Sequence, residues 1–117
     1  MNNKYIYQFE GSSGMQDMRY IMKMFRCGFR TIGNAEVKSV TELSKAADGT
    51  AGTEALEYRL AGGYSFIIRS SAFEPKIEVT VSVPDSSGDH AAETGKRICE
   101  DLENIIYIDN RLGYCCE

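Results

Sequence analysis

Apolar residues recur at helical spacing in two stretches of the chain. The first helix is predicted over residues 14–26, where one face carries Met15, Met18, Ile21, Met22 and Phe25. A second, longer helix is predicted over residues 88–107, with an apolar seam of Ala91, Gly95, Ile98, Leu102 and Ile105. Gly95 interrupts this seam with no side chain, which indicates a close approach between the second helix and its neighbour.

Between the two helices, apolar and polar residues alternate as they do in half-buried strands. Strands are predicted over residues 36–42, 54–60, 64–69 and 76–83. Residues 4–9 alternate only weakly, but they could form one more short strand. The expected core residues are Leu56, Tyr58, Phe66, Ile68, Val79, Val81, Ile98 and Leu102. The economical solution is an α+β fold, in which a single four-stranded antiparallel sheet carries both helices on one face.

Length and charge restrict the classes of protein that fit this pattern. The chain has 117 residues, enough for one domain. Thirteen basic residues against seventeen acidic ones give a net charge of −4, so we expect no nucleic-acid partner. No apolar run approaches the roughly 20 residues that span a bilayer, so we expect no membrane partner either. The N-terminus lacks the apolar segment of a secretory signal, and a cytoplasmic location is expected.

The cysteines and the single histidine do not form a metal-binding pattern. Cysteines stand at positions 27, 99, 115 and 116, without C-x-x-C spacing, and His90 is the only histidine. Structural zinc normally needs paired ligands at short spacing. We therefore expect no metal site, reduced thiols and no cofactor held by this domain.

The segment between the last two predicted strands has the residue types that a phosphate group requires. Arg69 ends a strand, two serines follow, and Lys76 opens the next strand. An arginine fork, hydroxyl donors, turn N–H groups and a lysine together suit a phosphate dianion. A polar hairpin turn with a solvated arginine has the same composition, so the residue types alone leave both interpretations open.

Residues 63–79 (GYSFIIRSSAFEPKIEV) resemble the C-terminal domain of the phosphoglucomutase/phosphomannomutase (α-D-phosphohexomutase) family. That domain has a strand, a loop of pattern R-P-S-G-T-E-P-K and another strand. Residues 10–26 are similar to the family's hinge and following helix, and residues 33–42 to its first strand in that domain. The resemblance covers about residues 10–107.

The resemblance implies a four-stranded, TATA-binding-protein-like domain over residues 14–110. Residues 1–13 are then the hinge or tail of a preceding domain, and residues 111–117 a tail. Full-length relatives interconvert hexose 1- and 6-phosphates, with a phosphoserine and Mg²⁺ supplied by other domains. The partners expected here are a sugar phosphate and those other domains, in cis or in trans. Catalysis of phosphoryl transfer needs nucleophile, metal and substrate positioned together, so this chain alone is expected to be inactive.

The residues that the resemblance places on the substrate phosphate are Arg69, Ser70, Ser71, Ala72 and Lys76. Arg69 and Ser71 match the family loop. Ala72 replaces its glycine, Phe73 replaces a threonine that donates a hydroxyl group, and Ser70 replaces its proline. These departures weaken the expected phosphate grip. Two functions therefore remain open: the phosphate-binding domain of a phosphohexomutase, or a stand-alone, non-enzymatic interaction or sugar-phosphate-sensing module.

Overall fold

The computed structural model describes residues 2–9, 13–43, 54–71, 74–84 and 88–112. Its elements, in chain order, are β1 (Asn2–Gln8), α1 (Gly14–Cys27), β2 (Thr31–Ile32), β3 (Ala35–Glu42), β4 (Ala55–Leu60), the 3₁₀ turn η2 (Ala61–Gly63), β5 (Ser65–Ser70), β6 (Lys76–Ser82) and α2 (Gly88–Leu112). The first helix and the four alternating strands therefore begin and end within one residue of the predicted positions. The second helix begins where predicted but continues five residues further than residue 107, to Leu112.

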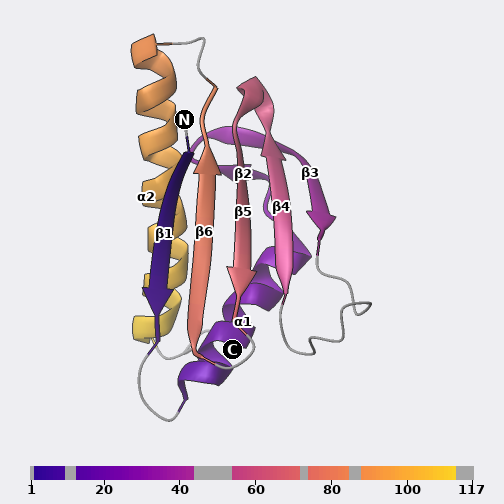
Figure 1. Cartoon of the computed structure of the whole chain (residues 1–117), viewed down its shortest axis with the longest axis vertical. Helices are drawn as coiled ribbons and strands as arrows, with labels where there is room; N and C mark the ends of the chain where they lie inside the picture. The colour runs from indigo at the N-terminus through magenta and orange to yellow at the C-terminus, as the bar shows by residue number, and fades with distance from the viewer. Residues whose placement is uncertain (1, 10–12, 44–53, 72–73, 85–87, 113–117) are drawn as a thin grey trace.

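The strands form one six-stranded sheet in the order β1-β6-β5-β4-β3-β2, and every neighbouring pair is antiparallel. The sheet bends into a half-barrel, and α1 and α2 lie on its hollow side (Figure 1). The first and last elements meet at one side, because β1 pairs with β6 and α2 runs beside them. The predicted fold, a four-stranded, TATA-binding-protein-like sheet with both helices on one face, is therefore wrong: the sheet has six strands and bends into a half-barrel around the helices.

The two additional strands explain the difference. The weak alternation of residues 4–9 belongs to β1, which pairs along its whole length with β6, from Asn2 opposite Ser82 to Gln8 opposite Lys76. The other strand, β2, has two residues, too few for any periodic signal. It is held by a hairpin with β3 in which Ile32 lies opposite Ala35. Together they widen the predicted sheet on both sides.

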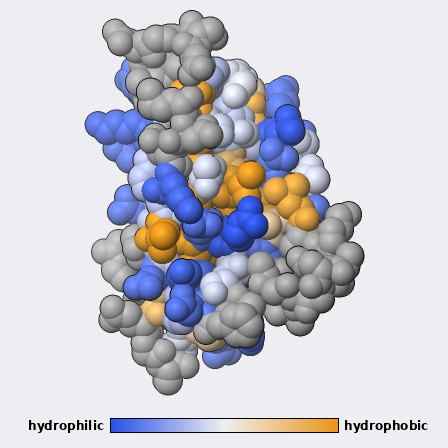
Figure 2. All heavy atoms as spheres, viewed as in Figure 1, coloured by the Kyte–Doolittle hydropathy of each residue, from blue (hydrophilic) through white to orange (hydrophobic). Residues whose placement is uncertain are grey.

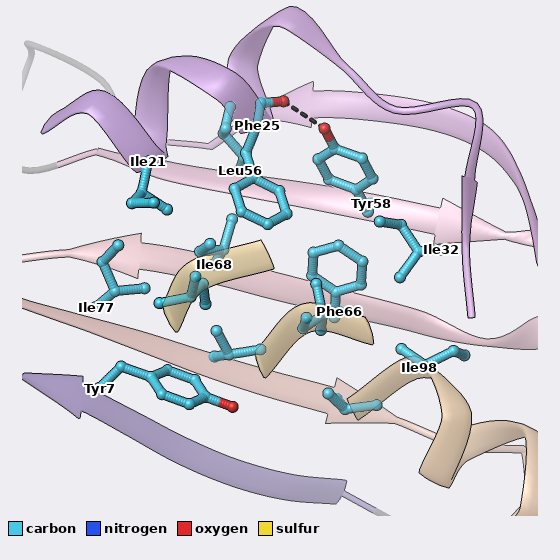
Figure 3. Close-up of a cluster of buried hydrophobic side chains, with 14 of the residues drawn as sticks. Tyr7, Ile21, Phe25, Ile32, Leu56, Tyr58, Phe66, Ile68, Ile77 and Ile98 are labelled. Carbon is cyan, nitrogen blue, oxygen red and sulfur yellow. Dashed lines mark hydrogen bonds between the residues drawn. The ribbon is translucent and has the colours of Figure 1, made fainter. Parts of the chain in front are cut away.

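Aromatic rings occupy the centre of the core, between α1 and the middle of the sheet (Figure 3). The rings of Tyr58 and Phe66 stack with centroids 4.8 Å apart, and Phe25 of α1 meets both edge-on, at 5.9 and 6.2 Å. Such offset and edge-to-face arrangements are the favourable geometries for aromatic pairs. All eight residues expected in the core are buried.

The second helix approaches the sheet closely at Gly95. A Cβ atom on this glycine would lie 2.8 Å from Cγ2 of Val83, closer than real carbon atoms approach. The close approach that the sequence indicated at Gly95 is confirmed.

The outer face of the half-barrel is largely polar. Figure 2, in the same view as Figure 1, shows hydrophilic residues around smaller hydrophobic patches. Lys4, Arg69 and Glu78 lie here on three adjacent strands: Glu78 Oε2 is 2.8 Å from Lys4 Nζ, and Glu78 Oε1 is 3.9 Å from Arg69 Nε. Exposed ion pairs of this kind contribute little to stability, typically about 0–1 kcal/mol.

Candidate functional site

Hydrogen bonds among Ser71, Glu74 and Lys76 join the two described ends of the loop between β5 and β6. The Ser71 N–H donates to the carbonyl of Lys76 at 3.2 Å, and the Lys76 N–H donates to the carbonyl of Glu74 at 2.8 Å. The Ser71 hydroxyl accepts the Glu74 N–H at 3.2 Å. The Ser71 oxygen thus helps to shape the turn. Ala72 and Phe73 lie outside the described residues, so the expected role of Ala72 has no structural account.

The structure does not bring Arg69 and Ser70 together. They are consecutive residues of β5, and successive side chains of a strand point to opposite faces. Arg69 lies half-exposed on the outer face, where Glu78 is directly opposite it on β6. Lys76 shares that outer face with Arg69, but its Nζ atom lies 3.2 Å from Glu74 Oε1. Both cations of the expected site therefore have a carboxylate beside them.

Ser70 points the other way, into the hollow side of the sheet, and is 3% exposed. Its Oγ accepts the N–H of Glu54 at 3.1 Å, and its own N–H donates to the Glu54 carbonyl at 2.9 Å. These two bonds fix Ser70 against the residue that precedes β4. A serine hydroxyl that accepts one hydrogen bond still carries a proton that it can donate.

Ser70 lines a half-enclosed hollow of about 390 Å³ between α1 and the ends of β4 and β5. The residues around it are Met18, Arg19, Met22, Lys23, Arg26, Glu54 and Ser70. The helix supplies five of them because α1 turns one edge toward the sheet, where buried methionines meet exposed cations. The volume falls at the lower end of the range for small-molecule sites.

Three cations stand along this edge of α1. Arg19, Lys23 and Arg26 are separated by four and three residues, so they project from the same side of the helix. One carboxylate faces them: Glu54 forms an ion pair with Arg26. The hollow therefore carries an excess of positive charge, in a chain whose net charge is −4.

Sequence reasoning assigned only one of these residues, Ser70, to a functional site, and it placed Ser70 in a different cluster. The spacing of the three cations was visible in the sequence, but an amphipathic helix normally carries charges on its solvent face. What the pattern could not supply was the position of α1 across the ends of β4 and β5. Without that position, the sequence does not show that the cations of α1 and the serine of β5 line the same hollow.

Metal ligands do not gather anywhere in the described part of the chain: no group of three or more His, Cys, Asp or Glu side chains is placed to hold an ion. Among the described helices, none is both long and apolar enough to cross a membrane. No protein-family model matches the sequence, and no curated protein matches it significantly.

Proposed function

We propose that this chain is a non-catalytic module that binds a small phosphorylated metabolite, such as a sugar phosphate, in the hollow between α1 and the ends of β4 and β5. The observation that carries the proposal is the convergence of three cations and a buried hydroxyl on one hollow of about 390 Å³. A sugar-phosphate-sensing module was one of the two functions that the sequence left open.

The side chains around the hollow divide into two kinds. Arg19 and Arg26 offer planar forks for pairs of phosphate oxygens, and Lys23 adds a mobile point charge. The Ser70 hydroxyl lies below them with a proton to donate. Met18 and Met22 give the hollow apolar surface on which the carbon frame of a ligand can rest. The bound anion would compete with Glu54 for Arg26.

The phosphohexomutase assignment stays a prediction, because it rests on a sequence resemblance alone. We favour the stand-alone module for two reasons. The fold that the resemblance implied is not the observed one, and Arg69 and Lys76 lie on the outer face, away from Ser70. The cytoplasmic location belongs to the same proposal. It is supported by Cys27 and Cys99, which are free thiols, as cysteines usually are in the reducing cytoplasm.

The test is a titration of the ¹⁵N-labelled chain with inorganic phosphate and with glucose 6-phosphate, followed by amide chemical shifts. We expect shifts across residues 19–26 and at Ser70. Because the hollow is only half enclosed, the dissociation constant should be roughly millimolar. Lys23→Glu should weaken binding about tenfold, because it replaces an attractive charge with a repulsive one.

Lys96→Glu is the matched control, since Lys96 is also an exposed helical lysine but lies on α2. It should leave the affinity within about twofold of the parent value. Shifts confined to Arg69 and residues 71–76 would place the anion on the loop and overturn the proposed site. Equal weakening by both variants would reduce the effect to net charge, and no shift at tens of millimolar phosphate would overturn anion binding altogether.

A further inference from the structure

Glu54 contacts the hollow beside α1 through its backbone and through its side chain. Its N–H donates to Ser70 Oγ at 3.1 Å, and its carbonyl accepts the Ser70 N–H at 2.9 Å. Its carboxylate forms the ion pair with Arg26. The same residue therefore fixes the buried hydroxyl group of the hollow and neutralises one of the three cations beside it.

The ion pair between Arg26 and Glu54 is half-exposed. The side chain of Arg26 is 44% exposed and that of Glu54 is 31% exposed. Ion pairs that water can reach contribute little to stability, because water solvates both charges when the pair opens. Arg26 can therefore exchange this carboxylate for another anion at small cost.

The other two cations of the hollow have no carboxylate beside them. Within the described residues, none of the ion pairs includes Arg19 or Lys23. Arg26 follows Lys23 by three residues, so the two side chains are neighbours on one side of the helix. A phosphate group held by Lys23 thus lies within reach of Arg26, the one cation of the three that already holds an anion.

Glu54 stays at the hollow when a ligand arrives. Because its backbone is bonded to Ser70 in both directions, its carboxylate remains close to Arg26. A group tethered in this way competes at an effective concentration that does not depend on the concentration of the ligand. A phosphate dianion and a carboxylate on the same guanidinium also repel each other. The ligand has to displace Glu54 from Arg26 in order to use all three cations.

We propose that Glu54 is a built-in competitor that occupies Arg26 in the empty hollow, lowers the affinity for the phosphorylated ligand and leaves Arg26 when the ligand binds. This inference rests on the proposed function, because it concerns the regulation of the same hollow. One ion pair then sets the ligand concentration at which the hollow fills. Binding also converts a paired carboxylate into an unpaired one, so the occupied and the empty chain differ at residue 54.

Glu54→Gln tests the competition directly. Glutamine has nearly the same size and keeps both backbone hydrogen bonds to Ser70, but it carries no charge. Titrations with inorganic phosphate and with glucose 6-phosphate, at constant ionic strength, should give dissociation constants about tenfold lower than in the parent chain, because Arg26 is available and one repulsive charge is gone. If Glu54 served only to shape the hollow, its replacement would weaken binding or leave it unchanged.

Glu57→Gln is the matched control, since it changes the net charge by the same amount on the same strand. Glu57 lies opposite Ile67 on the outer face, and its Oε2 is 3.6 Å from Arg59 NH2. Its replacement should leave the affinity within about twofold of the parent value. Circular dichroism should be the same for both variants and the parent. Equal tightening by both variants would reduce the effect to net charge and overturn the competition.

The side-chain carboxyl ¹³Cδ signal of Glu54 reports the exchange of partners without changing Glu54 itself. The Arg26→Gln chain provides the reference value for a Glu54 without its ion pair. In the parent chain, saturation with phosphate should move the signal toward this reference. A signal that stays at its starting value while the amides of residues 19–26 shift would show that Arg26 holds both anions, which overturns the displacement.

The titrations separate this inference from the proposed function. Binding by the parent chain, with Glu54→Gln unchanged or weaker, would overturn the competition and leave the proposed site in place. Absence of binding in both chains would overturn the proposed function, and the competition with it. Binding detected only in Glu54→Gln would support both.

Discussion

Tyr58 joins β4 to the end of α1 from inside the core. Its hydroxyl donates to the carbonyl of Phe25, which lies in the last turn of a helix that ends at Cys27. Carbonyls of a last turn have no partner within their own helix. Leaving such an acceptor buried and unbonded would cost about 1–3 kcal/mol. One side chain therefore fills the aromatic core and satisfies the helix end above it.

The buried hydroxyl makes stability depend on alkaline pH. Burial raises the pKa of Tyr58 to about 12, whereas a tyrosine in the unfolded chain titrates near 10. As the pH rises, the unfolded chain loses this proton first, which favours unfolding. The free energy of unfolding should be unaffected by this group up to about pH 10 and should fall between about pH 10 and 12, by up to about 1.4 kcal/mol per pH unit.

Urea unfolding of the parent chain and of Tyr58→Phe at intervals from about pH 9 to 11.5 measures this dependence. Tyr58→Phe should be less stable at every pH, but its stability should fall less steeply above pH 10. Tyr5 contributes a second alkaline group, because its hydrogen bond with Cys99 raises the pKa of Tyr5 to about 12. Tyr5→Phe is therefore the comparison that separates the two residues. Equal slopes for the parent and Tyr58→Phe would contradict the prediction.

The hairpin between β2 and β3 packs closely against α2. Its two loop residues both have positive φ, +60° at Gly33 and +67° at Asn34, as a two-residue hairpin loop of the I′ kind requires. The Gly33 N–H donates to Asp101 Oδ2 at 2.8 Å. A Cβ atom on Gly33 would lie 2.6 Å from the backbone of Ile98. The loop thus needs glycine both for its conformation and for its contact with the helix.

Gly33→Ala should therefore be destabilising by about 2–4 kcal/mol, because the backbone of α2 cannot move aside as a flexible side chain could. Asn34→Ala is a matched control: it also places alanine at positive φ, but at an exposed position that already has a Cβ. Its cost should be about 1 kcal/mol. Thermal and urea unfolding measure both. Equal losses would show that the contact with α2 contributes nothing.

Sequence periodicity was sufficient to locate the long helices and strands, but it could not locate the two-residue strand β2. The methionine and isoleucine spacing located α1 within one residue, and the alternation of Ile77, Val79 and Val81 located β6. The two residues of β2 have no period. The signal that could have found this strand is the Gly33-Asn34 dipeptide, since Gly-Asn between two apolar residues is typical of a tight hairpin.

At the scale of the whole molecule, the sheet depends on pairing between strands that are distant in the sequence, and local patterns do not predict that pairing. Tyr5 lies opposite Val79, and nothing in the alternation of either strand specifies the other as its partner. The residues of the expected phosphate site do not come together because the end of β5 lies one residue beyond the predicted end. Because β5 continues through Ser70, the alternation separates Arg69 from Ser70. Had the strand ended at Arg69, as predicted, the turn could have placed both on one side.

The position of β1 in the sheet makes residues 2–9 part of the folded unit. Tyr7 and Phe9 are buried in the core, and the Phe9 N–H donates to the Pro75 carbonyl at 2.8 Å. A chain that begins at residue 14, where the resemblance placed the start of the domain, would lose two core aromatics and β1, one of the two strands that pair with β6. We expect this shortened chain to show no cooperative unfolding transition, because truncating one buried aromatic alone costs about 3–5 kcal/mol.

Phe9→Ala provides a graded version of the same test in the full chain, with an expected loss of about 3–5 kcal/mol in urea unfolding. Lys4→Ala is its control on the same segment, since Lys4 lies on the outer face and its exposed ion pair with Glu78 should contribute less than about 1 kcal/mol. A shortened chain that unfolds cooperatively at the parent midpoint would contradict the prediction and show that the folded unit does not need β1. A large loss at Phe9 with little change at Lys4 would instead place the inner face of β1 in the core, because only the residues that point into the half-barrel would then matter.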